Sequence, residues 1–184
     1  MGPHVMRQPR SRSPRKPPPP LDTERLQALA LRYVERYAVT EAKLLRYLAR
    51  KIRERGWAEE KPADVDGIAA RFAELGYVND RMWSEAKSRS MAARGYGRRR
   101  VDMSLREAGV AEPLREDVSG KHDARAALDR FAQRKRIGPY ALEAPDRDVE
   151  RKQFAAALRA GHDFDLVKAL FAAETAEEFL GAEE

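Results

Sequence analysis

The sequence predicts an all-α protein: an elongated, curved array of three tandem three-helix repeats, preceded by a disordered tail rich in Pro and Arg. Apolar residues recur at helical spacing through most of the chain after residue 20, and no alternating Val, Ile or Thr run indicates a strand. Glycines expected to end helices, at positions 56, 109 and 161, are 53 and 52 residues apart, which indicates a repeat. Repeats this small leave apolar faces uncovered unless neighbours stack.

Length and composition limit the class of protein. The 184 residues, 42% of them apolar, are enough for one ordinary core or for two or three small linked cores. Cysteine is absent, which excludes disulfides and thiolate chemistry. No apolar run approaches the ~20 residues that span a bilayer, and residues 1–20 lack the apolar core of a signal peptide. We therefore expect a soluble, cytoplasmic protein with no membrane contact.

Residues 1–20 form the expected tail. They hold seven of the eleven prolines and carry a charge of +5. Such a segment buries too little apolar surface to offset the entropy of ordering it, so we expect disorder. Two roles stay open, a solvated leader and a loose electrostatic contact with nucleic acid.

The first repeat is expected over residues 21–76. Its first helix, over 22–37, has an apolar face made of Leu26, Leu29, Ala30, Tyr33, Val34 and Tyr37. Thr40 caps a second helix that ends at Gly56, and a third helix follows over about 64–75. The polar face of the second helix carries a basic patch: Arg46, Arg50, Lys51 and Arg53.

The second repeat is expected over residues 77–118. Its first helix covers about 80–94, and its second opens at Gly97 and closes at Gly109. The second helix turns three apolar residues inward: Val101, Leu105 and Ala108. The pair Glu112-Pro113 opens a short third helix.

The third repeat is expected over residues 119–184. Its helices are predicted over about 120–135, over 146–161 and from residue 163 onward. Residues 143–184 sum to −6, so this repeat has an acidic C-terminal end.

Charge is segregated along the chain. Residues 41–56 sum to +4 and residues 81–106 to +6, whereas residues 57–80 sum to −4. This distribution suits a polyanionic partner that approaches in one orientation, or a protein partner that exposes both signs.

The most basic stretch surrounds two glycines. Gly95 and Gly97 bracket Tyr96, which we expect to be exposed, and Arg98–Arg100 occupy the first turn of the next helix. Three cations in that turn oppose the helix macrodipole, a cost that a purely structural role would not select. The pattern therefore favours a surface that contacts phosphates or carboxylates.

Catalytic residues are not indicated. His4, His122 and His162 are isolated, and no His, Asp or Glu set has metal-ligand spacing. The run Gly95–Arg100 lacks the strand and the Gly-Lys-Ser/Thr ending of a P-loop. We expect a non-enzymatic protein without a metal or cofactor.

Residues 66–110 carry a family resemblance. Part of this region resembles the signature of RecX, a family of bacterial recombination regulators, through Gly76-Tyr77-Val78-Asn79-Asp80-(x2)-Trp83-Ser84 and Arg89-(x4)-Arg94-Gly95-Tyr96-Gly97-(x2)-Arg100-Val101-(x3)-Leu105-(x2)-Ala108-Gly109-Val110. The family pattern reads approximately Gly-Tyr-Leu-Asp-Asp-(x2)-Phe-Ala, then Arg-rich sequence, Gly-(x)-Gly and Leu-(x3)-Gly-Ile. Asn79, Trp83 and Ser84 depart from it conservatively.

The resemblance implies a modulator of the recombinase RecA. Members of this family bind along the groove of the RecA filament on single-stranded DNA. They limit its strand exchange, its ATP hydrolysis and the coprotease activity that triggers the SOS response. It further implies a monomer that binds duplex DNA at most weakly. Its expected RecA- or DNA-binding residues are Lys87, Arg89, Arg94, Tyr96, Arg98, Arg99, Arg100 and Arg106, with Arg46, Arg50, Lys51 and Arg53 as a second patch.

Two other functions stay open at this point. A helix-turn-helix regulator would place the helix over 97–108 in the major groove and normally act as a dimer. A non-specific DNA- or RNA-binding protein would need the electrostatics alone and would have a steep salt dependence.

Overall fold

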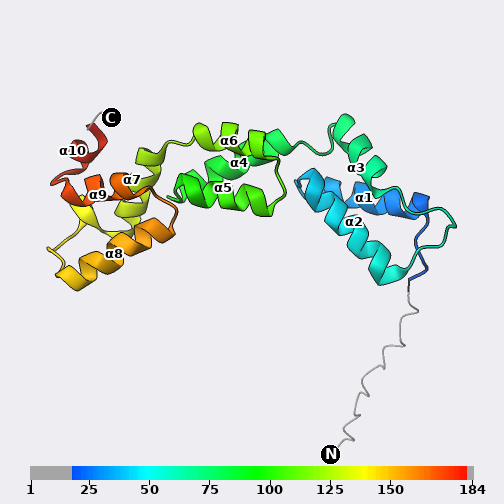
Figure 1. Ribbon diagram of the computed structural model, residues 1–184, viewed down its shortest axis with the longest axis horizontal. Helices are drawn as coiled ribbons and strands as arrows, with labels where there is room; N and C mark the ends of the chain where they lie inside the picture. The colour runs from blue at the N-terminus through cyan, green and yellow to red at the C-terminus, as the bar shows by residue number, and fades with distance from the viewer. Residues whose placement is uncertain (1–17, 182–184) are drawn as a thin grey trace, which may run out of the picture.

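The computed structural model describes residues 18–181 as a gently curved row of helices in three groups (Figure 1). Within that range, strand geometry is limited to an isolated bridge between Leu21 and Trp57. The predicted all-α array of repeats is confirmed. Its helices are α1 (Thr23–Arg36), α2 (Glu41–Arg55), α3 (Val65–Glu74), α4 (Asp80–Ala93), α5 (Arg98–Glu107), α6 (Glu112–Gly120), α7 (Ala124–Lys135), the 3-10 helix η1 (Gly138–Tyr140), α8 (Arg147–Arg159), α9 (Phe164–Ala172) and α10 (Ala176–Gly181).

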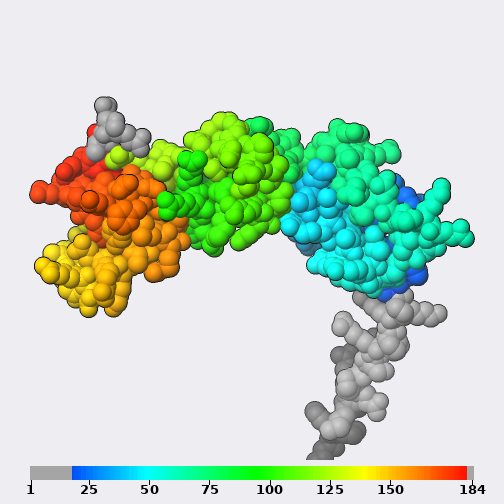
Figure 2. All heavy atoms as spheres, in the orientation of Figure 1, coloured from blue at the N-terminus to red at the C-terminus, as the bar shows by residue number. Residues whose placement is uncertain are grey.

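Each group buries its own small core. The first group, α1–α3, packs around Leu26, Leu44 and Leu48, and the second, α4–α6, around Val101 and Leu105. The third group, α7–α10 with η1, is centred on Leu128, Phe131, Val167, Leu170 and Phe179. Three separate cores along one row explain the elongated shape, which is clear in the space-filling view (Figure 2).

Side-chain caps set most of the helix starts. Asp22, Thr40, Asn79 and Asp163 each accept a hydrogen bond from a backbone N–H in the first turn of the helix that follows. Such caps satisfy N–H groups that have no partner inside the helix. The second and third helices of each repeat accordingly begin close to the predicted residues. Helix α6 ends later than expected, since it runs on to Gly120, past the repeat boundary predicted at residue 118.

Helix α10 is an element that the sequence did not predict. It begins after Thr175, whose Oγ accepts from the Glu178 N–H at 3.1 Å, while the Glu178 carboxylate accepts from the Glu174 N–H at 2.7 Å. The Thr175 bond matches one half of a capping box, whereas the Glu178 carboxylate accepts from the residue before the cap and not from Thr175 itself. Phe179 of α10 is 1% exposed and completes the core of the third group.

The expected tail lies mostly outside the described range, which begins at residue 18. Pro19 and Pro20 are held in place: the Arg55 guanidinium donates two hydrogen bonds to the Pro19 carbonyl, at 2.6 and 3.1 Å. Leu21 is fully buried, and its N–H donates to the Gly56 carbonyl at 2.9 Å. The chain is therefore fixed against the end of α2 from residue 19 onward.

The joint between the first two groups places the N-terminus of α2 against the end of α5. The Thr40 hydroxyl donates to the Ala108 carbonyl at 2.7 Å, and the Arg46 guanidinium donates to the same carbonyl at 3.2 Å. Gly109 follows with φ of +82°, and a Cβ there would lie 2.3 Å from the Cβ of Ala42. Glycine thus permits both the left-handed turn and the close approach.

The joint between the second and third groups repeats this geometry one repeat later, with the N-terminus of α5 against the end of α8. The Gly97 N–H donates to the Ala160 carbonyl at 3.0 Å, and the Arg99 N–H donates to the Gly161 carbonyl at 3.2 Å. A Cβ on Gly97 would lie 2.3 Å from the Gly161 carbonyl. His162, 1% exposed, bonds through Nε2 to the Gly95 carbonyl at 3.1 Å and packs on the Phe131 ring.

Both joints place helices end to end in the order α8, α5, α2. The carbonyl end of one helix, which carries partial negative charge, meets the positive amide end of the next. This changes the interpretation of Arg98–Arg100, because the end of α8 and the carboxylate of Asp163 lie beside that turn. The positive end of α5 is therefore offset by neighbouring negative groups. The electrostatic cost of placing three arginines in that turn is reduced, and their position does not by itself indicate a binding role.

We predict that the G97A variant weakens the second joint. Gly97 has φ of −76°, so alanine fits the backbone there and its Cβ clashes with the Gly161 carbonyl. Overpacking of this kind costs about 1–3 kcal/mol. Thermal unfolding followed by circular dichroism should show a lower Tm for G97A. G120A is the control, since no atom lies within 4 Å of a Cβ at Gly120. Equal Tm values for G97A and the wild type would contradict the close packing.

We also predict that His162 makes the second joint acid-sensitive. The pKa of His162 is lowered from about 6.5 to about 4, chiefly by burial, with the bond to Gly95 opposing the shift and the nearby His122 adding to it. Below pH 6.5 the unfolded chain takes up a proton that the folded chain does not. The free energy of unfolding therefore falls as the pH drops from about 6.5 to about 4, by up to about 1.4 kcal/mol per pH unit.

The H162Q variant isolates the contribution of His162 to the pH dependence of the unfolding free energy, because glutamine offers an N–H donor and does not titrate. Urea unfolding of both proteins at pH 7 and pH 5 gives the measurement. The wild type should lose roughly 2 kcal/mol more than H162Q between the two pH values. Equal losses in the two proteins would show that His162 is not held neutral.

Candidate functional site

The predicted basic residues of α5 divide between two sides of the helix. Arg98, Arg99 and Arg106 line a cleft of about 770 Å³ that opens toward the third group. Arg100 instead lines a separate pocket of about 170 Å³ that faces α4. A 100° turn per residue explains the division, because residues 98, 102 and 106 share one face and residues 100, 103 and 107 share another.

The cleft side of α5 is balanced in charge. Arg99 pairs with Asp163 at 2.8 Å, and Arg106 pairs with Asp102 at 3.2 Å. Asp102 also accepts from Arg115, whose side chain is 11% exposed, at 2.7 Å. Arg98, Arg99 and Arg106 remain exposed, but carboxylates already accept hydrogen bonds from Arg99 and Arg106.

The opposite side of α5 is more strongly basic. Lys87, Arg94, Tyr96 and Arg100 gather around the small pocket, with the Arg94 guanidinium 5.6 Å from the centre of the Tyr96 ring. Tyr96 is half-buried against the second core, so the expected exposed aromatic residue is a packed one. Arg89 lies on an exposed face of α4, outside both pockets, 4.0 Å from Glu85.

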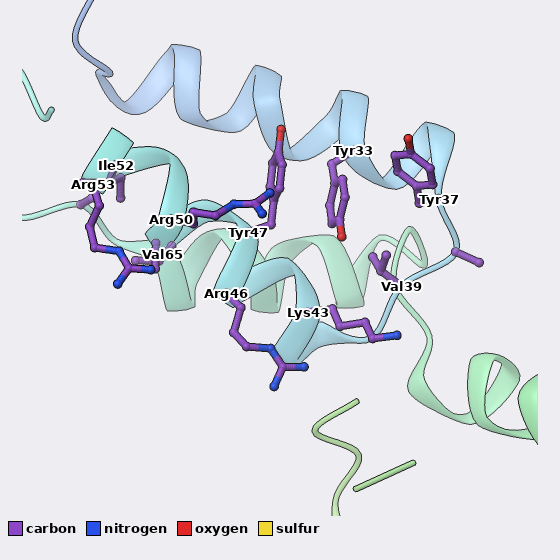
Figure 3. Close-up of a pocket in the computed structure, with 13 residues that line it drawn as sticks. Tyr33, Tyr37, Val39, Lys43, Arg46, Tyr47, Arg50, Ile52, Arg53 and Val65 are labelled. Atoms are coloured by element: carbon purple, nitrogen blue, oxygen red, sulfur yellow. The ribbon is translucent and has the colours of Figure 1, made fainter. Parts of the chain in front are cut away.

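The first group presents a basic groove along α2. The groove has a volume of about 1070 Å³, and Arg46, Arg50 and Arg53 of the predicted patch line it. Three tyrosines, Tyr33, Tyr37 and Tyr47, line it as well. Figure 3 shows the Arg50 guanidinium beside Tyr47, whereas the Arg46 and Arg53 guanidinium groups point away from the tyrosine rings. Lys51, the fourth residue of the patch, pairs with Glu54 at 2.6 Å and does not line the groove.

Lys43 lies at the first joint, between the groove and the second group. It lines the groove, and its Nζ lies 4.2 Å from the centre of the Trp83 ring, a cation–π contact across that joint. Burial lowers the pKa of Lys43, and repulsion from Lys87 and Arg46 lowers it further. We call the cations of the groove and of the small pocket the basic track: Arg53, Arg50, Arg46, Lys43, Lys87, Arg94 and Arg100.

Carboxylates are scarce along the basic track. Within the described residues, no carboxylate lies within 4.0 Å of the cationic groups of Lys43, Arg53, Lys87, Arg94 or Arg100. Arg50 has a loose contact with Glu54 at 3.6 Å. The track can therefore bind phosphates or carboxylates of a partner without first breaking strong ion pairs.

Lys43 and the three tyrosines of the groove were not predicted as site residues from the sequence. Tyr33 and Tyr37 were expected on the apolar face of the first helix, whereas Tyr37 lies just past the end of α1 and is 49% exposed. A signal was present in the tyrosines interleaved with Arg36, Arg46 and Arg50, a pattern typical of nucleic-acid-binding surfaces.

Neither metal-binding nor membrane-spanning features are found in the part of the chain that the structure describes. It contains no group of three or more His, Asp or Glu side chains placed to hold a metal ion. None of its helices combines the length and the apolarity needed to cross a bilayer.

Comparison with known proteins identifies the family. The chain is 33% identical over 156 residues to regulatory protein RecX of Myxococcus xanthus, an alignment that covers 78% of this chain and 82% of the relative. The chain belongs to the RecX family. It is also 28% identical over 153 residues to RecX of Agrobacterium fabrum, with 80% of this chain and 82% of the relative covered. A scan against models of known protein families gave no match.

Solved RecX structures share the fold. The structure of RecX from Lactobacillus salivarius superposes with a TM-score of 0.66 at 16% identity, covering 83% of this chain and 96% of that one. A second RecX crystal structure gives a TM-score of 0.61 at 19% identity, covering 82% of this chain and 73% of that one. The family resemblance predicted from residues 66–110 is therefore confirmed over most of the chain.

Proposed function

We propose that this chain is a regulator of RecA that binds the RecA filament on single-stranded DNA. It lowers the recombinase, ATPase and coprotease activities of the filament, and so tunes recombinational repair and the SOS response in the bacterial cytoplasm. It acts as a non-enzymatic monomer without a cofactor. Membership of the RecX family supports the choice of target.

The basic track is the observation that carries the proposal. It crosses a joint between two repeats, so its cations keep a fixed spacing along a surface longer than one repeat. A nucleoprotein filament offers a matching partner, since it presents phosphates and acidic side chains repeatedly along one direction. The six remaining predicted residues extend the contact surface beyond the track in this proposal: Lys51, Arg89, Tyr96, Arg98, Arg99 and Arg106.

The helix-turn-helix alternative fits the geometry poorly. A recognition helix reads bases with its N-terminal residues in the major groove. Here the N-terminus of α5 packs against Ala160 and Gly161 of the third group, which would have to leave before duplex DNA could approach. A non-specific RNA-binding protein needs only the positive charge, and the following experiment separates that function from RecA regulation.

We predict that the variant K87E/R94E/R100E loses inhibition of RecA. The assay measures RecA ATP hydrolysis on single-stranded DNA with the regulator present at substoichiometric amounts. Wild-type protein should inhibit, and reversing three cations of the track should raise the concentration needed for half-inhibition by about tenfold or more, because attraction becomes repulsion. The variant should keep its helical content, since the changed side chains lie on the surface or half-buried in the small pocket.

The matched control is R147E/R151E/K152E, which makes the same charge change on exposed positions of α8. It should inhibit nearly as well as wild type. Equal inhibition by both triple variants would show that the basic track is not the contact surface. A wild-type protein that binds RNA tightly and leaves RecA hydrolysis unchanged would contradict RecA regulation itself.

A further inference from the structure

We propose that the groove between α1 and α2 is a base-stacking subsite for single-stranded DNA. This proposal rests on the proposed function, because the filament is what presents a single strand to this chain. The volume of about 1070 Å³ lies at the upper end of the range of roughly 300–1,000 Å³ that is usual for small-molecule pockets. The groove is therefore large enough to admit a nucleotide base.

A row of aromatic rings forms one wall of the groove (Figure 3). The rings of Tyr47 and Tyr33 stack with centroids 4.0 Å apart and planes 5° apart, and Tyr37 lies 5.5 Å beyond Tyr33 at a tilt of 56°. Tyr33 and Tyr47 are half-buried against the first core, which fixes them, while 49% of Tyr37 remains exposed. A base that stacks on Tyr37 would lengthen a row that already exists.

The ends of this row carry cations. The Arg50 guanidinium lies 5.7 Å from the Tyr47 ring, and the Arg36 guanidinium lies 5.4 Å from the Tyr37 ring. A guanidinium plane can cover the second face of a base that an aromatic ring already supports. Arg36 already lies over the Tyr37 ring and leaves no room for a base between them, so it would have to swing outward to cover a base stacked on Tyr37.

The charge of the lining selects a polyanion. Lys43, Arg46, Arg50 and Arg53 line the groove, and no Asp or Glu is among its lining residues. Single-stranded DNA matches both the cations and the tyrosines of the groove, because its phosphates can pair with the cations and its flat bases can stack on the tyrosines. An acidic polypeptide would satisfy the cations alone. The chain's own Pro-rich tail is disfavoured as an occupant, because residues 1–20 carry +5.

The test uses the full chain and two fluorescently labelled probes, oligo-dT and an abasic oligonucleotide of equal length. Fluorescence anisotropy measures both affinities for the wild type, Y37L and Y37F. The wild type should bind oligo-dT more tightly than the abasic probe. Y37L should weaken oligo-dT binding by about tenfold, equivalent to about 1.4 kcal/mol, and leave abasic binding unchanged. Y37F keeps the ring and should bind like wild type.

Three results would overturn the subsite: equal oligo-dT affinities of Y37L and wild type, an equal loss on the abasic probe, or tyrosine-dependent binding of poly-glutamate at the affinity of oligo-dT. The RecA hydrolysis assay, run on the same proteins, separates the two proposals. If the wild type inhibits RecA hydrolysis but the Tyr37 variants bind DNA like the wild type, the subsite is rejected and RecA regulation stands. If oligo-dT binding depends on Tyr37 but RecA hydrolysis is not inhibited, RecA regulation is rejected and the subsite stands.

Discussion

The glycine that ends the second helix of a repeat controls how that repeat attaches to the preceding one. Gly109 and Gly161 both adopt positive φ, and both lie so close to the neighbouring repeat that a Cβ would clash. The carbonyls beside them accept hydrogen bonds from the start of the preceding second helix, from Thr40 in one joint and from Gly97 and Arg99 in the other. Two joints of one design give a row with a defined direction and curvature.

This direction determines where the cations lie. Docking α5 onto the end of α8 places Arg99 beside Asp163 and leaves Arg100 on the opposite side, next to Lys87. Docking α2 onto the end of α5 brings Lys43 close to Lys87, so basic regions that are separate in the sequence form one track. The surface proposed to contact the RecA filament is therefore a product of the joints and not of any single helix.

Much of the fold could be predicted from the sequence, because caps and stop residues act locally: Thr40, Gly97 and Gly161 start or end helices where the pattern indicated. The division of the α5 cations between two sides of the helix and the groove of Tyr33, Tyr37 and Tyr47 could not be predicted, because both depend on which repeat packs against which face. Helix α10 was missed although Thr175 caps it, since the segment is short and acidic. The His162 joint was also hidden, as an isolated histidine carries no sequence pattern.

Both joints must be rigid for the basic track to keep a fixed geometry. Distance distributions between spin labels test this rigidity most directly. The chain has no cysteine, so Q27C/S90C and S90C/K168C place label pairs on exposed positions of α1, α4 and α9, one pair across each joint. Pulsed electron paramagnetic resonance should give a single narrow distance distribution for each pair. Broad distributions would show repeats that move independently and would contradict a basic track of fixed geometry.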